Sequence, residues 1–428
     1  MPWYALAASL LICFGIWRWA ETILLPSNTK VAQSKRIPIG NNSDLYPRWL
    51  GARESLLHGR DPYSPEMTSE MQAGFYGRPL DPKNPSDPKD QVGFAYPLYV
   101  IFLLAPTVTL PFSAVLKMFQ WLLLMSLAGC VPLWMGAVGF HTRPVFKAVG
   151  MLLAVSCYPA VSEYHLQNLA VLVALMLAAA SAAAVRGWLV LAGFLIALST
   201  IKPQLSALFI LFFMLWTAGQ WKTRQRLFYS FFASLLALFV AAEAVSPGWV
   251  GRFLTAIRAY QSYAADPSIL QVLLPAWLAG LLAAALVGFL VLRLWQWRKG
   301  PAGGQQFGWA LAWTAAVTLA VMPKLAAYNQ PLLIPALLVL LANRKTIWKA
   351  RLLPRALTKG VLMCLLWQWG AALVLALASL LVPPSRLQPA AGVPEYTLLA
   401  LPPITLLAML ASAGASARAR AASAKSVG

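Results

Sequence analysis

Residues that build metal sites and disulfides are scarce in this chain. It has three histidines and four cysteines among its 428 residues. The cysteines lie in apolar runs and form no Cys-x-x-Cys pair, so we expect buried thiols that pack as small hydrophobic groups. The histidines are scattered, and neither a His-Glu-x-x-His nor an Asp-x-Asp motif occurs. We therefore expect no metal site and no cofactor.

Acidic residues are also few, and their distribution is uneven. The chain has 13 aspartates and glutamates against 34 lysines and arginines, a net charge of +21. The basic residues lie in short gaps between apolar runs, without a continuous basic face or an RNA-binding motif, so nucleic acid is not an expected partner. No glycine-rich loop precedes a helix, which argues against a nucleotide-sugar donor. Eight of the 13 acids lie in residues 26–91, which marks this segment as a place for chemistry.

Apolar residues dominate the remainder of the chain, at 60% of all residues and a mean hydropathy of +0.66. Apolar runs of about 17 to 25 residues recur, the length that a helix needs to cross ~30 Å of hydrocarbon. Because lipid offers the backbone no hydrogen-bond partner, these runs must be helices. The sequence predicts an all-α transmembrane helix bundle with a first transmembrane helix (1–25), an extracytoplasmic loop with short amphipathic helices (26–95), the main bundle (96–413) and a basic cytoplasmic tail (414–428).

The basic gaps predict how the bundle is oriented. Placing them in the cytoplasm gives alternating crossings of the plasma membrane, with both termini cytoplasmic. The apolar run 96–110 fits no full crossing and is predicted to be a re-entrant or interfacial helix beside a cavity. In the first loop we expect one helix over 43–58, capped by Ser43 or Asp44, and a second from 65 or 66 to 75. The 12 expected spans are 3–25, 112–138, 144–158, 168–185, 187–201, 203–217, 227–245, 269–292, 305–321, 329–342, 359–382 and 396–413.

Five short motifs follow one another along the chain. They are Asp44-Leu-Tyr46, Gly59-Arg-Asp61-Pro62-Tyr63, Phe94-Ala-Tyr96-Pro97-Leu98, His165-Leu-Gln167-Asn168 and Ile201-Lys202-Pro203. In order and spacing this set resembles glycosyltransferase family 87. Two positions depart from the family pattern. Leu98 replaces the second proline of the family's Tyr-Pro-Pro element, and Leu166 lies where the family's Gly-Gln-x-Asn element starts with Gly-Gln, a start that this chain does not keep. The histidine that mannoside-forming members carry in a late outer loop is absent from 323–329.

The resemblance implies an integral-membrane enzyme of the GT-C class. Such enzymes take a sugar, here a mannose-like hexose or pentose, from a polyprenyl-phosphate donor. They transfer it to a lipid or glycan acceptor on the outer face of the membrane. The reaction needs a carboxylate that takes the acceptor proton and cationic or dipolar groups at the departing phosphate. It also needs an apolar groove for the prenyl tail, and membrane lipids complete the expected partners.

Asp44 is the candidate general base, with a helix cap as its alternative role. Asp61 is the second choice, and its alternative role is to form a turn. Lys202 is the best phosphate ligand, unless its side chain reaches out to the lipid headgroups. The candidate substrate-binding residues are Tyr46, Asp61, Tyr63, Glu163, His165, Gln167, Asn168, Lys202, Lys324, Tyr328 and Asn329.

Two other functions are compatible with a polytopic membrane protein. A transporter or lipid flippase would carry ionisable residues near the membrane midplane, or internal repeats. Here Arg18 and Lys117 are the only basic residues within apolar runs, and the two halves of the chain show no repeat. A polysaccharide polymerase or ligase also uses lipid-linked sugars, but such proteins place their large loop late in the chain. Both functions stay open as alternatives to the transferase.

Overall fold

The computed structural model describes the backbone of residues 2–35, 37–81, 83–84, 86–263, 267–323, 326–350 and 352–425. Within these ranges the regular structure is helical throughout and contains no strand. The predicted all-α class is therefore confirmed. Every backbone hydrogen bond of a helix is made inside its own segment, which is what a chain surrounded by lipid requires.

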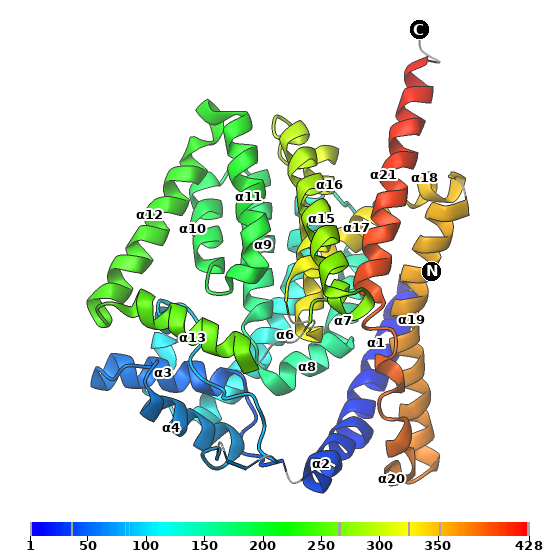
Figure 1. Cartoon of the computed structure of the whole chain (residues 1–428). Helices are drawn as coiled ribbons and strands as arrows, with labels where there is room; N and C mark the ends of the chain where they lie inside the picture. Colours follow the sequence, from blue (N-terminus) through cyan, green and yellow to red (C-terminus); the bar gives the residue numbers. More distant parts are fainter. Residues whose placement is uncertain are drawn as a thin grey trace.

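The first helical segment runs without a break from α1 (Pro2–Trp19) through a π-helical turn, η1 (Ala20–Leu24), into α2 (Leu25–Ser34). α1 packs along α19 (Leu352–Leu381), which in turn packs on α21 (Leu401–Lys425). Buried apolar side chains of α1, η1 and α19 form a cluster of their own, separate from the main core. In Figure 1 these helices stand together on one side of the molecule, beside the remaining bundle.

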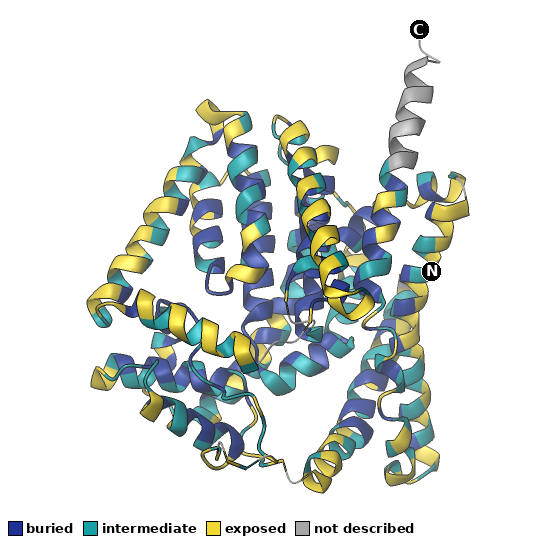
Figure 2. Ribbon diagram, viewed as in Figure 1, coloured by how far each residue is buried: buried dark blue, intermediate teal, exposed yellow. Residues whose placement is uncertain are grey.

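The main bundle is built around α9 (Ala170–Val185) and α16 (Gln305–Val321). Both helices are mostly buried, as expected for helices that are apolar on all sides. In Figure 2 exposed residues run along the outer faces of α12 (Trp221–Val245) and α15 (Ala276–Trp297). Many of these are apolar, including Leu236 and Leu281, which indicates contact with lipid. The helices packed around the centre are α6 (Phe112–Ala137), α10 (Leu189–Ser199), α11 (Pro203–Gly219), α12 (Trp221–Val245), α15 (Ala276–Trp297) and α17 (Ile334–Ala342).

Several helices have the length and composition of membrane spans. A further crossing results if α7 (Pro144–Val155) and α8 (Tyr158–Leu166), which are bent by 57° relative to each other, act as one span. The shorter apolar helices have 10–17 residues each. The chain is thus a membrane protein, while the expected count of 12 spans stays a prediction. Within the described part of the chain, the five helices that satisfy both criteria are Trp3–Ser34, Phe112–Ala137, Trp221–Val245, Ala276–Trp297 and Leu352–Leu381.

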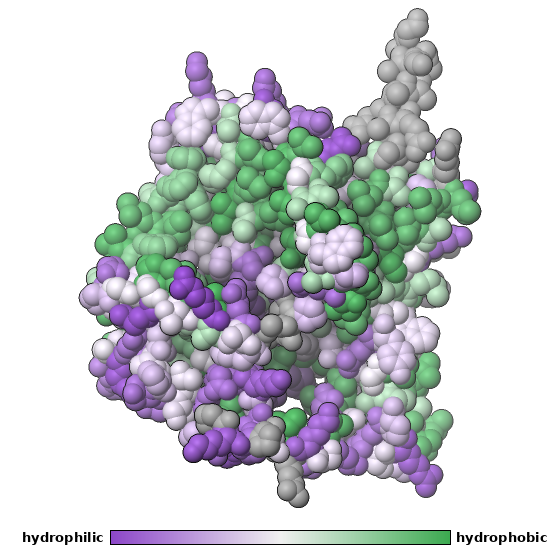
Figure 3. Space-filling view, viewed as in Figure 1, coloured by the Kyte–Doolittle hydropathy of each residue, from purple (hydrophilic) through white to green (hydrophobic). Residues whose placement is uncertain are grey.

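The segment after α2 folds into a helical layer at one end of the bundle. α3 (Leu45–His58) ends at Gly59, whose φ of +65° is the left-handed conformation that favours glycine at this position. α4 (Pro65–Tyr76) begins at Ser64, whose hydroxyl caps the helix. Figure 3 shows hydrophilic side chains gathered over this layer and apolar side chains over the bundle above it.

The apolar run 96–110 does not form a crossing helix. It contains α5 (Val100–Leu104) and the 3-10 turn η2 (Ala105–Thr107), which are far too short to cross ~30 Å of hydrocarbon. α3 packs on α5, and Trp49 Nε1 of α3 donates a hydrogen bond to the carbonyl of Thr107 at 3.2 Å. The α3–α4 layer is therefore docked on the bundle through this run.

Shorter helices connect the long helices of the bundle. α13 (Trp249–Tyr263) lies across the molecule between α12 and the α3–α4 layer (Figure 1). The 3-10 segment η3 (Ala327–Leu333) packs against α8, α9 and α16. The remaining short elements are α14 (Ile269–Leu273), α18 (Arg344–Lys349), α20 (Pro384–Leu387), η4 (Gln388–Ala390) and η5 (Val393–Glu395).

Candidate active site

A cavity of about 690 Å³ lies between the α3–α4 layer and the bundle. Its walls come from the start of α3, the extended residues 90–97, the start of α9, residues 201–204, α13 and η3. These segments are distant in sequence, so only the folded chain brings them together. Five of the predicted site residues line the cavity, namely Asp44, Asn168, Lys202, Tyr328 and Asn329.

Asp44 immediately precedes α3, but its side chain does not cap the helix. Its backbone N–H donates to the carbonyl of Leu166 at 2.7 Å, and its Oδ2 accepts a hydrogen bond from Asn168 Nδ2 at 2.7 Å. Ser43 Oγ instead accepts from the N–H of Leu45 at 3.3 Å. Among the described residues no donor bonds to Asp44 Oδ1. The carboxylate is thus oriented by the α8–α9 junction, with one oxygen left for a ligand.

Asn168 connects Asp44 with Lys202. α8 ends at Leu166, and the left-handed φ of 49° at Gln167 redirects the chain, so that Asn168 lies two residues before α9. Asn168 Oδ1 accepts hydrogen bonds from Lys202 Nζ at 2.5 Å and from the N–H of Ala170 at 3.1 Å. Because a carboxylate accepts and an ammonium donates, these two neighbours assign the orientation of the amide.

Lys202 is a buried lysine, with only 6% of its surface exposed. It directly precedes Pro203, the first residue of α11, and its Nζ lies 5.1 Å from the centre of the Tyr328 ring. An ammonium over an aromatic ring is attracted by the negative face of the ring. The alternative reading, a lysine that reaches out to lipid headgroups, does not describe this side chain.

The η3 segment supplies two further polar residues to the cavity lining, Tyr328 and Asn329. Tyr328 and Asn329 are both buried, and Asn329 Oδ1 has no hydrogen-bond partner among the residues that the structure describes. Gln330, the next residue, donates from Nε2 to the carbonyl of Leu398 at 2.8 Å, which anchors η3 to the chain before α21. Lys324, the second predicted phosphate ligand, lies outside the described residues.

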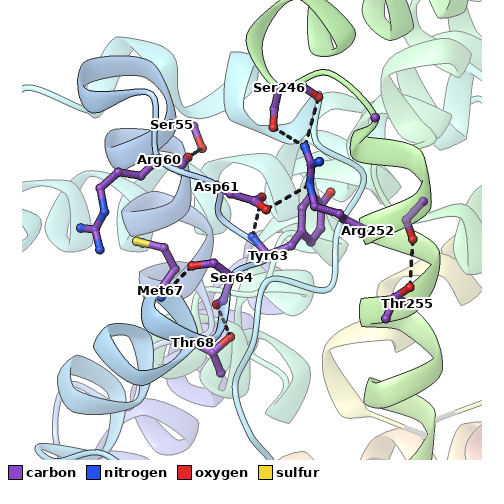
Figure 4. Close-up of polar contacts among 12 residues, drawn as sticks. Ser55, Arg60, Asp61, Tyr63, Ser64, Met67, Thr68, Ser246, Arg252 and Thr255 are labelled. Atoms are coloured by element: carbon purple, nitrogen blue, oxygen red, sulfur yellow. Dashed lines mark hydrogen bonds and ion pairs between the residues drawn. The ribbon is translucent and has the colours of Figure 1, made fainter.

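Asp61 and Tyr63 do not line the cavity; they hold two of its walls in place. Asp61 Oδ1 accepts from the N–H of Tyr63 at 3.1 Å, and its Oδ2 lies 3.0 Å from Arg252 Nε of α13 (Figure 4). The Tyr63 hydroxyl donates to the carbonyl of Tyr96 at 2.7 Å. Burial raises the pKa of this hydroxyl, so it remains a donor at neutral pH. Of the two readings of Asp61, the turn is the one with geometric support.

Tyr46 also lies away from the cavity. Its ring packs edge-on against Phe112 at a centroid distance of 4.9 Å and lies close to Trp49. Gly74 of α4 makes room for this ring, because a Cβ at that position would lie 2.0 Å from a Tyr46 ring atom. Tyr46 therefore joins α3 and α4 to the start of α6, rather than contacting a ligand in the cavity.

The three predicted residues of α8 and its end do not line the cavity either. Glu163 is 1% exposed, and within the described structure neither of its carboxyl oxygens has a hydrogen-bond partner. His165 Nε2 lies 3.5 Å from Glu21 Oε1 of the first helical segment. Gln167 Nε2 donates to the carbonyl of Tyr164. These side chains lie around the helix that carries the Asp44 contact, but the prediction that they bind substrate gains no support from the cavity.

Seven polar or charged lining residues were not among the predicted site residues: Arg48, Asp90, Tyr96, Gln204, Tyr260, Gln261 and Gln271. Arg48 follows Asp44 by four residues in α3, a spacing that places two side chains on the same helix face. In α13, spacings of four and three residues bring Phe253, Ile257 and Tyr260 onto one face, which lines the cavity. Helical periodicity was therefore a usable signal for these positions. The apolar lining includes Phe75, Val92, Ile201, Phe253, Ile257, Ala276 and Met322.

A comparison with models of protein families matches residues 94–323 to glycosyltransferase family 87. The matched region contributes Tyr96, Asn168, Lys202 and the lining face of α13 to the cavity, whereas Asp44 and Arg48 precede it. No curated protein and no solved structure matches the chain.

Proposed function

Because the chain belongs to glycosyltransferase family 87, we propose that this membrane glycosyltransferase takes a sugar from a polyprenyl-phosphate donor and transfers it to a hydroxyl of a lipid or glycan acceptor, with Asp44 as the general base. The observation that carries this proposal is one cavity that combines a carboxylate, a buried lysine and an apolar wall. These are the three features that transfer from a lipid phosphate requires.

In the proposed reaction Asp44 Oδ1 accepts the proton of the acceptor hydroxyl while the hydroxyl oxygen attacks the anomeric carbon. The bond between that carbon and the phosphate oxygen breaks, and its electron pair leaves with the polyprenyl phosphate. The Asn168 bond to Oδ2 supports this role because it fixes the carboxylate without occupying the second oxygen. A group that takes a proton must lie within hydrogen-bond reach and be held in the right orientation.

Lys202 is proposed to stabilise the charge that develops on the departing phosphate. Asn168 bonds to Lys202 and Asp44 at once, so the base and the cation keep a fixed distance from each other. Fixed charges in a site with little water stabilise a transition state without reorganisation at the moment of reaction. The Tyr328 ring adds to this by holding the ammonium in place.

The apolar lining is proposed to receive the first isoprene units of the donor. Phe253 and Ile257 of α13, with Ile201 and Met322, form this part of the cavity. The charge distribution supports an orientation in which the α3–α4 layer faces outward and both termini are cytoplasmic. A mannose-like hexose or pentose fits the family, although 323–329 lack the histidine of mannoside-forming members.

A deletion strain tests this proposal. Lipids and envelope glycans of the strain, complemented with the wild-type gene or with Asp44→Asn, are compared by mass spectrometry. We expect the deletion to remove species heavier by one sugar residue, the wild type to restore them, and Asp44→Asn to leave them absent at equal protein level. Asp87→Asn, in the same loop but outside the cavity lining, is the matched control. Full restoration by Asp44→Asn would exclude Asp44 as the base.

A further inference from the structure

The arginines that face the α3–α4 layer differ in their partners. Arg60 pairs with Glu54 and Glu70. In the same way Arg78 pairs with Asp87, and Arg252 of α13 with Asp61. Arg48 lines the cavity and forms no ion pair with any carboxylate in the described part of the chain. Arg53 of α3 also has no ion pair with a carboxylate among the described residues, but of these two arginines only Arg48 lines the cavity.

The guanidinium of Arg48 is nevertheless held firmly. Its Nη1 donates to the backbone carbonyl of Asp44 at 2.7 Å, and its central carbon lies 4.8 Å from the centre of the Tyr96 ring. Its Nε is buried and has no hydrogen-bond partner within the described structure. A buried donor on a charged group without an acceptor is costly unless a ligand supplies one.

Guanidinium groups match phosphate better than other side chains, because their planar fork of donors fits two phosphate oxygens at once. Lys202 is already engaged with Asn168 and the Tyr328 ring. We propose that Arg48 is a ligand for a phosphate group bound in the cavity, and that the phosphate is that of the polyprenyl donor. The inference rests on the proposed function, because that function supplies the phosphate.

This assignment gives Arg48 two connected roles. It binds the departing phosphate through its free donors, and through Asp44 O it connects the start of α3 to the bound donor. Binding of the donor thus stabilises the position of the backbone that carries the base. A phosphate on the acceptor could use the same donors, and the kinetic arms of the test separate these two sources.

Arg53 offers a matched control on the same helix. Its guanidinium also lies over an aromatic ring, that of Trp49, at 5.5 Å, but it does not line the cavity. Arg48→Gln is the main variant, because glutamine removes the charge while its amide can still donate to the Asp44 carbonyl. Arg48→Lys keeps the charge and loses the fork. Thermal unfolding of each purified variant establishes that it is folded.

The first measurement is equilibrium binding of undecaprenyl phosphate to the full-length protein in nanodiscs of uncharged lipid. We expect Arg48→Gln to bind roughly ten- to a hundredfold more weakly than wild type, the effect of losing hydrogen bonds from a charged group. Arg48→Lys should lie in between, and Arg53→Gln should bind as wild type does. Wild-type affinity in Arg48→Gln, or an equal loss in Arg53→Gln, would overturn the inference.

Steady-state kinetics identify the source of the phosphate. A rise in the donor KM of Arg48→Gln with an unchanged acceptor KM supports the donor, whereas a rise confined to the acceptor KM contradicts it. The binding arm also separates this inference from the proposed function. Wild-type protein that binds undecaprenyl phosphate but transfers no sugar refutes the function alone, and the Arg48 variants still decide the inference. Wild-type protein that binds no undecaprenyl phosphate refutes both.

Discussion

Replacing Asn168 by aspartate places a second carboxylate beside Asp44 with almost no change of shape. The amide nitrogen that donates to Asp44 Oδ2 at 2.7 Å becomes an oxygen that cannot donate when ionised. Two unit charges at this distance repel by about 1.5 kcal/mol in water and by about 6 kcal/mol at an effective dielectric constant of ~20. The two carboxylates of Asn168→Asp therefore favour a state in which they share one proton.

The consequence is a change in the pH dependence of transfer. At about 1.4 kcal/mol per pH unit, the smaller repulsion already moves the acidic limb of the pH–rate profile upward by about one unit. Lys202 offsets part of the larger estimate, because its Nζ lies 2.5 Å from the Asn168 side chain, so one to two units is the expected range. We expect activity near neutral pH to fall and to recover as the pH rises.

The assay is the pH dependence of kcat/KM for sugar transfer, measured with purified wild type, Asn168→Asp and Asn168→Ala. The alanine variant breaks the same bridge without adding a charge, so it should be slower but keep the acidic limb of the wild type. If the acidic limb of the pH–rate profile of Asn168→Asp superimposes on that of the wild type, the reasoning that Asn168 orients the base is refuted.

The other predictions concern the cation, the helix packing and the loop. Lys202→Met should lower kcat/KM by about 10²-fold or more, because charge at the phosphate is no longer stabilised. Gly193→Ala should destabilise the protein by about 1–3 kcal/mol, because the added Cβ would lie 2.4 Å from a backbone carbonyl oxygen of α12. Gly280→Ala is the control, because a Cβ at that position meets no atom within 4 Å. The hydrogen bond from Arg60 lowers the pKa of Glu70 below its ordinary 4.5, so the stability that this pair contributes is present above that pH and is lost as the pH falls through the lowered pKa.

Each of these outcomes has a direct readout. The Lys202→Met prediction is tested by steady-state kinetics, with Lys202→Arg as the variant that keeps the charge. Undiminished transfer by Lys202→Met would contradict it. The Gly193→Ala prediction is tested by thermal unfolding. Equal unfolding midpoints for Gly193→Ala and Gly280→Ala would contradict it. Hydrogen exchange of α4 between pH 6 and pH 3 tests the third. If the exchange protection of α4 does not decrease between pH 6 and pH 3, the Arg60–Glu70 pair does not have the stabilising role assigned to it.

The sequence was sufficient to predict the fold class, because long apolar runs leave the backbone no choice but helix. It was less informative about the number of spans. Helices such as α10 (Leu189–Ser199) have only 11 residues and bury one face against neighbouring helices, so length and hydropathy do not tell a short span from a core helix. The run 96–110 was predicted to be an incomplete crossing because a full crossing would place basic gaps on both sides of the membrane, and its prolines also limit helix length.

The site was predicted unevenly. Asp44, Asn168 and Lys202 were chosen from motifs, and they meet through hydrogen bonds that no local pattern specifies. Asp61 and Tyr63 belong to an equally recognisable motif, yet they position cavity walls, because a motif marks a required residue without saying what the residue touches. Arg48 was overlooked as one more polar residue of an amphipathic helix, and only tertiary packing distinguishes it from arginines with acidic partners.

Transfer by purified, reconstituted protein offers the decisive comparison for the general base. Wild type, Asp44→Asn and Asp87→Asn are supplied with a polyprenyl-phosphate-linked sugar and a lipid extract from the deletion strain, and the new glycosidic product is measured by mass spectrometry. We predict transfer by wild type and Asp87→Asn, and a loss of about 10²- to 10⁴-fold in Asp44→Asn with donor binding retained. Equal rates for Asp44→Asn and wild type would show that Asp44 is not the base.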